Sequence, residues 1–327
     1  MYPNHHNDIT PLCQLPIDMI KTFSLDYMHL CCLGVMRKLL LAWIRGKREV
    51  RLSSGQICEL NKRLIAVKSF IPNVFSRLPR TLDEVDRWKA TEFRLFMLYT
   101  GKLVLRGILP QQLYQHFLAF SVALSILVSP SLAASQHNYA HELLLYFVDK
   151  CKELYGEEFL VYNVHGLTHV ASEAEEFGCL DRCSSFPFEN YLQQLKKLVR
   201  SGRKPLVQVV KRLQEQQTEQ TVRIPQTFGV AKKVKNNAYI LDNSFGCEVL
   251  PDNDADSNSH TVLCRVYKKT RPLFIDPCDS RIVHTYMADA RDSTVEAVST
   301  ARLDTRAIMV KMGSSFDTCF MSILHEI

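Results

Sequence analysis

Two histidines four residues apart, His165 and His169, are well suited by type and spacing to bind a metal ion. On a helix such residues share a face, so both imidazoles can reach one ion. Asp26 and His29, three apart in an earlier helical segment, form a second half-site of the same kind. Together the four would give three imidazoles and one carboxylate, a tetrahedral set that suits Zn²⁺. We therefore predict that these four side chains converge on a structural zinc ion.

The same spacing has a simpler interpretation. Polar residues three or four apart also occur together at helix surfaces, or hydrogen-bonded in a core, without binding any metal. Cys179 and Cys183, four apart, have no further Cys or His pair close by in the sequence, so we interpret them as structural thiols.

Glu189 is a candidate for catalysis. It follows Ser185-Phe186-Pro187-Phe188, which is typical of a helix start with proline in the first turn. An acid there stabilises the positive end of the helix dipole, which is a sufficient structural reason for its presence. The functional interpretation is that Glu189 is a ligand of a divalent metal used in phosphoryl transfer.

The segment after Glu189 is strongly basic. Seven cations fall within 17 positions, and no acid lies between Glu189 and Glu215. The seven are Lys196, Lys197, Arg200, Arg203, Lys204, Lys211 and Arg212. Such a surface suits the phosphates of DNA, although a solvated helix face can have the same composition. We expect the first five to contact DNA.

Hydrophobic periodicity predicts mainly helices up to residue 220. The expected helices cover Pro16–Ile44, Ser53–Phe70, Thr81–Val104, Pro110–Val128 and Gln136–Tyr155. Ser53 and Thr81 are expected as N-caps, the latter in a capping box with Glu84, and Gly156 as a helix end.

After about residue 222, short apolar runs alternate with turn residues. The runs Ala238–Leu241, Thr261–Tyr267, Arg281–Met287 and Ala307–Met312 are expected to be strands. The predicted class is α+β, with a helical domain over 1–220 and a small antiparallel β-rich domain over 225–327.

The composition is that of a folded intracellular protein. Of 327 residues, 46% are apolar and 23% charged, and the net charge of +6 permits a polyanionic partner. Eleven cysteines at irregular spacing, with no leader-like start, predict reduced thiols. The longest apolar run, Phe117–Val128, is shorter than the roughly 20 residues that span a membrane.

Several ordered segments resemble animal transposon-derived proteins related to cut-and-paste transposases of the CACTA (En/Spm) type. They are Asp26-Tyr27-Met28-His29-Leu30, Leu33–Leu40, Arg87–Arg94, Asn163-Val164-His165 with His169, and Pro187-Phe188-Glu189-Asn190 with Leu195-Lys196-Lys197. The resemblance covers roughly residues 10–205 and, more loosely, the β-rich tail.

The resemblance implies an RNase H-like catalytic core with an Asp-Asp-Glu metal triad, interrupted by a helical insertion. It matches Asp26 and His29 to an Asp-x-x-His motif, His165 and His169 to the later histidine pair, and Glu189 to the final acid. An intact parent enzyme would use Mg²⁺. Only 25 residues precede Asp26, so the two strand-borne aspartates have no counterpart and a complete RNase H-like core is not expected.

We therefore expect an incomplete or domesticated transposase fragment, nuclear, that binds DNA and does not cleave it alone, because one glutamate cannot hold two metal ions. The alternative is a helical interaction protein with no nucleic-acid role. An autonomous zinc hydrolase using His165, His169 and Glu189 would leave Asp26, His29 and the basic helix unexplained.

Overall fold

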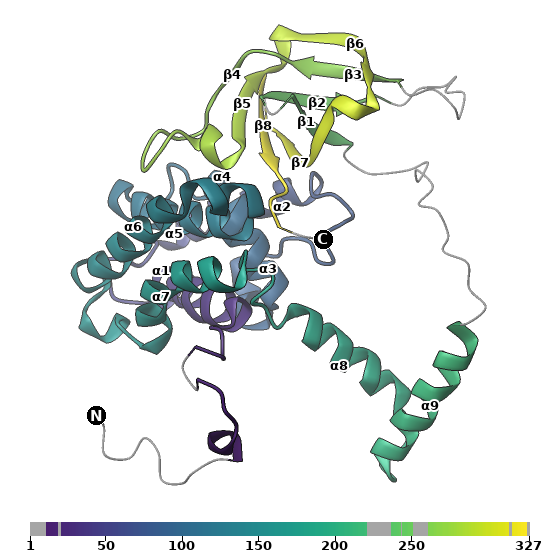
Figure 1. The fold of residues 1–327 in the computed structure, drawn as a ribbon. Coiled ribbons are helices and arrows are strands. Elements are labelled where there is room, and N and C mark those ends of the chain that lie inside the picture. The colour runs from purple at the N-terminus through teal and green to yellow at the C-terminus, as the bar shows by residue number, and fades with distance from the viewer. Residues whose placement is uncertain are drawn as a thin grey trace.

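The computed structural model describes residues 11–18, 21–220, 237–242, 244–250, 261–313 and 316–325. A central body of helices carries a curled antiparallel sheet on one side and a two-helix arm on another (Figure 1). The helices lie N-terminal to the strands, so the predicted α+β class and the order of its two parts are confirmed.

The body is built from α-helices joined by short 3₁₀ and π-helical turns. Its elements are η1 (Pro11–Gln14), η2 (Met28–Met36), α1 (Arg37–Arg45), α2 (Ser54–Lys68), η3 (Leu82–Arg87), α3 (Ala90–Leu95), η4 (Phe96–Thr100), α4 (Gly101–Val104), α5 (Gln111–Val128), α6 (Pro130–Tyr155), η5 (Glu157–Phe159) and α7 (Tyr162–Phe177). The arm consists of α8 (Phe186–Leu198) and α9 (Pro205–Gln220).

The centre of the body is α5, which is buried from Phe117 to Val128. This is the longest apolar run of the sequence, and it packs against α6 and η4. Burial of such a run on all sides explains why it is apolar around the whole helix rather than on one stripe. No helix in the described ranges has the length and apolarity needed to cross a membrane.

Several helix ends agree with the sequence signals. Ser53 accepts a hydrogen bond from the amide of Gln56 and so caps α2. Gly156 ends α6 with a φ of +95°, a backbone conformation that residues other than glycine rarely adopt.

Three helix predictions are wrong in their bounds. The helix expected from Gln136 begins at Pro130, with non-helical backbone at Gln136. In the described part of the segment expected from Pro16, the continuous helix begins at Met28, whose amide donates to the carboxylate of Asp26. The segment from Thr81 is interrupted after η3. Trp88 there has an extended backbone (ψ 143°), and its ring packs against Phe93 and Phe96. Thr81 makes no side-chain cap.

In the described part of the chain, eight strands form one antiparallel sheet in the order β4-β5-β8-β7-β1-β2-β3-β6. They are β1 (Ala238–Leu241), β2 (Phe245–Val249), β3 (Thr261–Tyr267), β4 (Thr270–Pro272), β5 (Thr285–Asp289), β6 (Ser293–Ser299), β7 (Leu303–Lys311) and β8 (Asp317–Ser322). The predictions for 238–241 and 261–267 are confirmed. The run predicted from Arg281 begins instead with a 3₁₀ turn, η6 (Ser280–Val283), and Ala307–Met312 is only the last part of β7 with one residue beyond it.

The curl of the sheet encloses a small core of its own. Tyr267 and Phe320 pack there with ring centroids 4.9 Å apart. Gly246 lies against the Phe320 ring so closely that a Cβ would come within 2.6 Å of ring carbons. Glycine at this position therefore lets the strands curl around the aromatic pair.

The opposite side chains of the same strands belong to the core of the helical body. Ile308, Val310, Cys319 and Met321 are buried in one cluster with helix residues such as Leu103. Sheet and helices thus share one apolar core rather than meeting across a wet interface.

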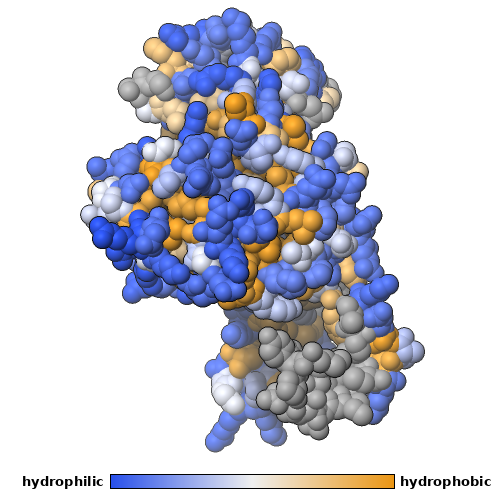
Figure 2. Space-filling model, turned by 90° about the vertical axis from the view of Figure 1, so that its left-hand side faces the viewer, coloured by the Kyte–Doolittle hydropathy of each residue, from blue (hydrophilic) through white to orange (hydrophobic). Residues whose placement is uncertain are grey.

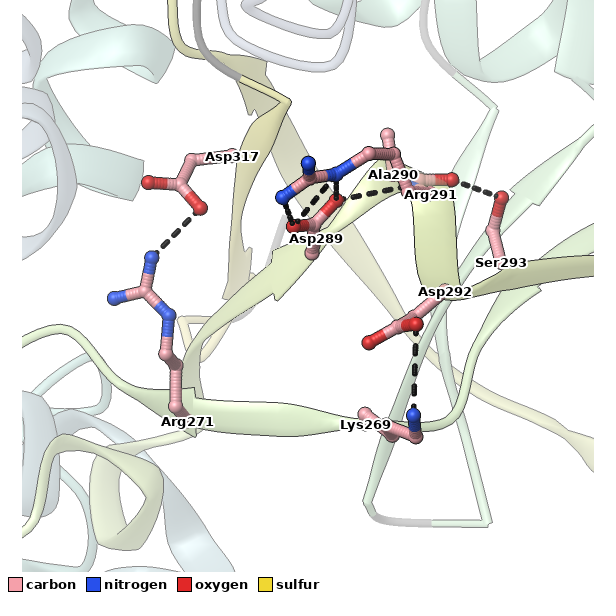
Figure 3. A network of polar contacts seen from close by, with 8 residues as sticks. All are labelled: Lys269, Arg271, Asp289, Ala290, Arg291, Asp292, Ser293 and Asp317. Carbon is pink, nitrogen blue, oxygen red and sulfur yellow. Dashed lines mark hydrogen bonds and ion pairs between the residues drawn. The ribbon is translucent and has the colours of Figure 1, made fainter.

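Ion pairs hold the corner of the sheet where β4, β5 and β8 meet (Figure 3). Arg271 on β4 donates to Asp317 on β8 at 2.6 Å, across the intervening β5. Arg291 donates to both oxygens of Asp289, and Lys269 lies 3.5 Å from Asp292. These charges neutralise one another at the surface, where each pair is worth at most about 1 kcal/mol.

Candidate functional site

Asp26 joins the start of η2 to the start of α8. Its Oδ1 accepts hydrogen bonds from the amides of Met28 (3.1 Å) and Ser185 (2.8 Å), and Ser185 is the residue that precedes α8. Its Oδ2 accepts from the amide and from Nδ1 of His29. One carboxylate therefore satisfies otherwise unpaired amides at two helix starts.

The charge of Asp26 is favoured by these contacts. Partial burial raises the pKa of its carboxyl, but hydrogen bonds from His29, Ser185 and Met28 outweigh burial, so the pKa is lowered overall. Donors aimed at the ionised form stabilise it. Asp26 is consequently a carboxylate at neutral pH, in a structural position between two helices.

His29 stands between Asp26 and Glu189. Its Nδ1 contacts Asp26, and its Nε2 lies 3.5 Å from Oε1 of Glu189 in the first turn of α8. His29 and Glu189 are both more than half exposed. The contact adds a second link between η2 and α8, although an exposed pair stabilises the fold by at most about 1 kcal/mol.

His165 and His169 lie on the exposed face of α7, as their spacing predicted. Their rings meet edge to face with centroids 5.5 Å apart. Across the described residues, no group of three or more His, Cys, Asp or Glu side chains is placed to hold a metal ion. The convergence of His165 and His169 with Asp26 and His29 is not tested by this finding. Zinc binding itself is untested and stays a prediction.

η2 and α7 pack closely against each other. A Cβ at Gly34 would lie 2.5 Å from the Asn163 amide nitrogen, and one at Gly166 would lie 2.6 Å from a Leu30 methyl group. The two elements therefore meet through their small and apolar residues. His165 and His169 are left on the exposed face of α7.

Arg94 was not singled out by the sequence analysis as a site residue. Its guanidinium carbon lies 4.3 Å from the centroid of the Phe186 ring, and Nη1 lies 3.5 Å from Asp181. This stack fixes the first residue of α8 against the body. Arg94 belongs to the segment Arg87–Arg94, which is part of the resemblance, but the resemblance assigns no role to this residue.

Two adjoining hollows lie at the foot of α8, with volumes of about 390 and 600 Å³. We call them together the α8 groove. Both are lined by Ser76, Arg77, Thr91, Phe186 and Asn190. One also reaches Phe75, Arg94, Asp181 and His325, and the other Met28, Trp88, Lys89 and Glu189. Segments far apart in the sequence that carried the resemblance (residues 26–30, 87–94 and 187–190) thus meet at one place.

The basic residues lie at the far end of the arm. Lys196 and Lys197 are in the last turn of α8, and Arg200, Arg203 and Lys204 are in the connection to α9. All five are exposed, and none of the five side chains has an ion-pair partner in the part of the chain that the structure describes. We call these five residues the arm tip.

Apolar side chains are also exposed on the arm. Phe188, Tyr191, Leu192 and Leu206 are between 50% and 79% exposed. The space-filling view shows apolar side chains at the surface of the body and of the arm below it (Figure 2).

Comparison of the chain with family models, curated proteins and solved structures yields no match.

Proposed function

We propose that this protein is a transposase-derived DNA-binding protein that contacts DNA phosphates through the arm tip. The observation that supports the proposal most strongly is the gathering of five exposed cations, without acidic partners among the described residues, at the end of an arm that extends from the body (Figure 1). Cations on a projecting element can approach a polyanion without the rest of the surface interfering.

Binding of this kind follows phosphate charge rather than base sequence. Each neutralised phosphate releases condensed counterions, which gives a log–log salt slope of about −0.9 per contact. Five contacts would give a slope of about −4.5. The expected affinity is therefore weak at physiological salt and much stronger at low salt.

The test compares two variants with the same change in net charge. In the first, Lys196, Lys197, Arg200, Arg203 and Lys204 are replaced by alanine. In the second, five exposed cations on the body are replaced by alanine: Arg48, Arg51, Lys62, Lys68 and Arg106. Fluorescence anisotropy with a duplex DNA should show loss of binding and of most of the salt slope for the first variant alone. Equal losses in both variants would reduce the effect to net charge.

We also propose that the chain alone does not cleave DNA when Mg²⁺ or Mn²⁺ is supplied. The side chain that faces Glu189 is His29 rather than a second carboxylate, and two-metal chemistry needs acids flanking both ions. A supercoiled plasmid should remain intact with the purified chain. Nicking that disappears in Glu189→Gln would overturn this part of the proposal.

The alternative is a helical interaction protein whose basic arm binds an acidic protein. The observation that favours it is the exposed apolar surface of α8 and α9, including Phe188 and Leu206. An acidic partner with an apolar face would complement both properties of the arm. Absence of DNA binding even at low salt would favour this alternative.

A further inference from the structure

We propose that the α8 groove binds a single-stranded nucleic-acid segment, with an unpaired base against the Arg94–Phe186 stack and flanking phosphates at Arg77 and Lys89. The inference rests on the proposed function and deepens it, because the groove is lined by residues of α8, the first helix of the same arm. Four observations on the groove support it.

The first observation is the charge of the groove. Arg77 and Lys89 are exposed on its wall, and neither side chain has an ion-pair partner among the residues that the structure describes. The acids of the groove are already engaged, since Asp181 faces Arg94 and Glu189 faces His29. The cations left over favour an anionic ligand.

The second observation is a planar platform. The Arg94 side chain is only 17% exposed, its guanidinium is held over the Phe186 ring, and Phe75 lines the same hollow. Unpaired bases stack on aromatic rings and on guanidinium planes, and each such contact is worth about 1–3 kcal/mol. The bases of a duplex are already stacked and paired, so their faces cannot use this platform.

The third observation is an unsatisfied polar atom. Oγ1 of Thr91 is buried and has no hydrogen-bond partner among the described residues, and Thr91 lines both hollows of the groove. A buried hydroxyl without a partner costs free energy that a ligand can recover. The edge of a base, which carries both donors and acceptors, can pair with it.

The fourth observation is size. The more polar end of the groove measures about 600 Å³ and the end beside Phe75 about 390 Å³. Volumes of this order hold one small ligand each. One nucleotide in the aromatic end and its neighbour in the polar end would match the volumes of the two hollows and the positive charge of the groove.

Tryptophan fluorescence can report on the groove. Trp88 lines it, whereas Trp43, the second of the two tryptophans, is buried among core residues of the body. We expect an oligothymidylate of about eight nucleotides to quench Trp88, since stacking platforms bind such short strands. A blunt DNA hairpin of matched charge is the comparison.

Two groove variants and two references test the assignment. Arg77→Ala with Lys89→Ala should weaken oligothymidylate binding at least tenfold and leave hairpin binding within twofold. Thr91→Val, which keeps the shape and removes the hydroxyl, should weaken it about fivefold. The matched control is Arg48→Ala with Lys62→Ala, and the second reference is the variant that lacks the arm-tip cations.

The outcomes separate the two proposals. If the arm-tip variant still binds the hairpin normally while the groove variants lose the oligothymidylate, the proposed arm contact fails and the groove assignment stands. If the groove variants bind the oligothymidylate as the unchanged protein does, or if the control loses as much, the groove assignment is overturned. Folding of every variant is checked by its urea midpoint.

Discussion

Lys102 is buried at the junction of helices and sheet, and no carboxylate among the described residues pairs with it. Its Nζ donates to Oγ of Ser125 at 2.8 Å, and only 1% of the residue is exposed. Burial lowers the pKa of its ammonium group to about 7 from the usual 10.5, and the thiols of Cys278 and Cys319 offset this only in part. In the sequence, Lys102 is the single lysine within the largely apolar stretch 95–105, a position that is typical of a buried residue.

This lysine makes stability depend on pH in a defined window. Between pH 7 and 10.5 the unfolded chain holds more protons at Lys102 than the folded chain, so stability rises with pH across that range. Below pH 7 both states are protonated and the cost of burial is complete. Replacement by methionine should therefore stabilise the protein by an amount on the order of 5 kcal/mol near pH 6.5, and by much less near pH 10.

Urea unfolding of the Lys102→Met variant and the unchanged protein at several pH values measures this difference. Leu103→Met, a neighbouring apolar replacement, serves as the control for repacking. If the free energy of unfolding depends on pH in the same way for Lys102→Met and for the unchanged protein, the pKa of Lys102 does not differ between the folded and unfolded states.

At the scale of elements, the attachment of α8 depends on Asp26. Alanine at this position removes the acceptor for the amides of Met28 and Ser185, and loss of a cap costs about 1–2 kcal/mol. Asparagine keeps one carbonyl oxygen for those amides and should cost less than half as much. Urea midpoints and hydrogen exchange of the Ser185 amide give the two readouts.

The same pair of variants distinguishes a cap from a zinc ligand. If Asp26 acts as a cap, a chelator leaves the unchanged protein as stable as before, and asparagine remains the milder replacement. If Asp26 binds zinc, a chelator should destabilise the unchanged protein to the level of the alanine variant, because structural zinc contributes to folding directly.

The starts and ends of elements show how far local sequence could lead. Ser53, Pro187 and Gly156 act through neighbours in the chain, so their roles were predictable. Trp88 leaves the helix because its ring packs on Phe93 and Phe96 and its Nε1 donates to the carbonyl of Thr81. That choice depends on burial in three dimensions, and the capping-box pattern at Thr81 could not reveal it.

At the scale of the whole molecule, alternation of strands and turns predicted a β-rich part but neither its strand order nor its partner. β1 pairs with β2, which follows it directly in the sequence, and also with β7, which lies about 65 positions further along. The placement of Asp26 beside Ser185 likewise spans 159 positions. Such contacts follow from packing, so local sequence could name Asp26 as a candidate residue but could not reveal its contact with Ser185.

The shared core predicts that sheet and helices unfold together. Met321 on β8 is buried in the same cluster as the helices, and its replacement by alanine should cost about 2–5 kcal/mol. Trp43 and Trp88 report on the body, so their fluorescence midpoint in urea should fall together with the hydrogen-exchange protection of the β8 amides. Separate transitions in the variant would indicate two independently folding units.

The arm touches the body through its first turn, which makes α8 a lever with its pivot at Ser185. Thirteen residues at a rise of about 1.5 Å give a lever of roughly 20 Å. A tilt of about 10° at the pivot would then displace the far end by roughly 3.4 Å, which is about one phosphate step along a DNA strand. A ligand bound against Phe186 would thus change which phosphates the distant cations reach.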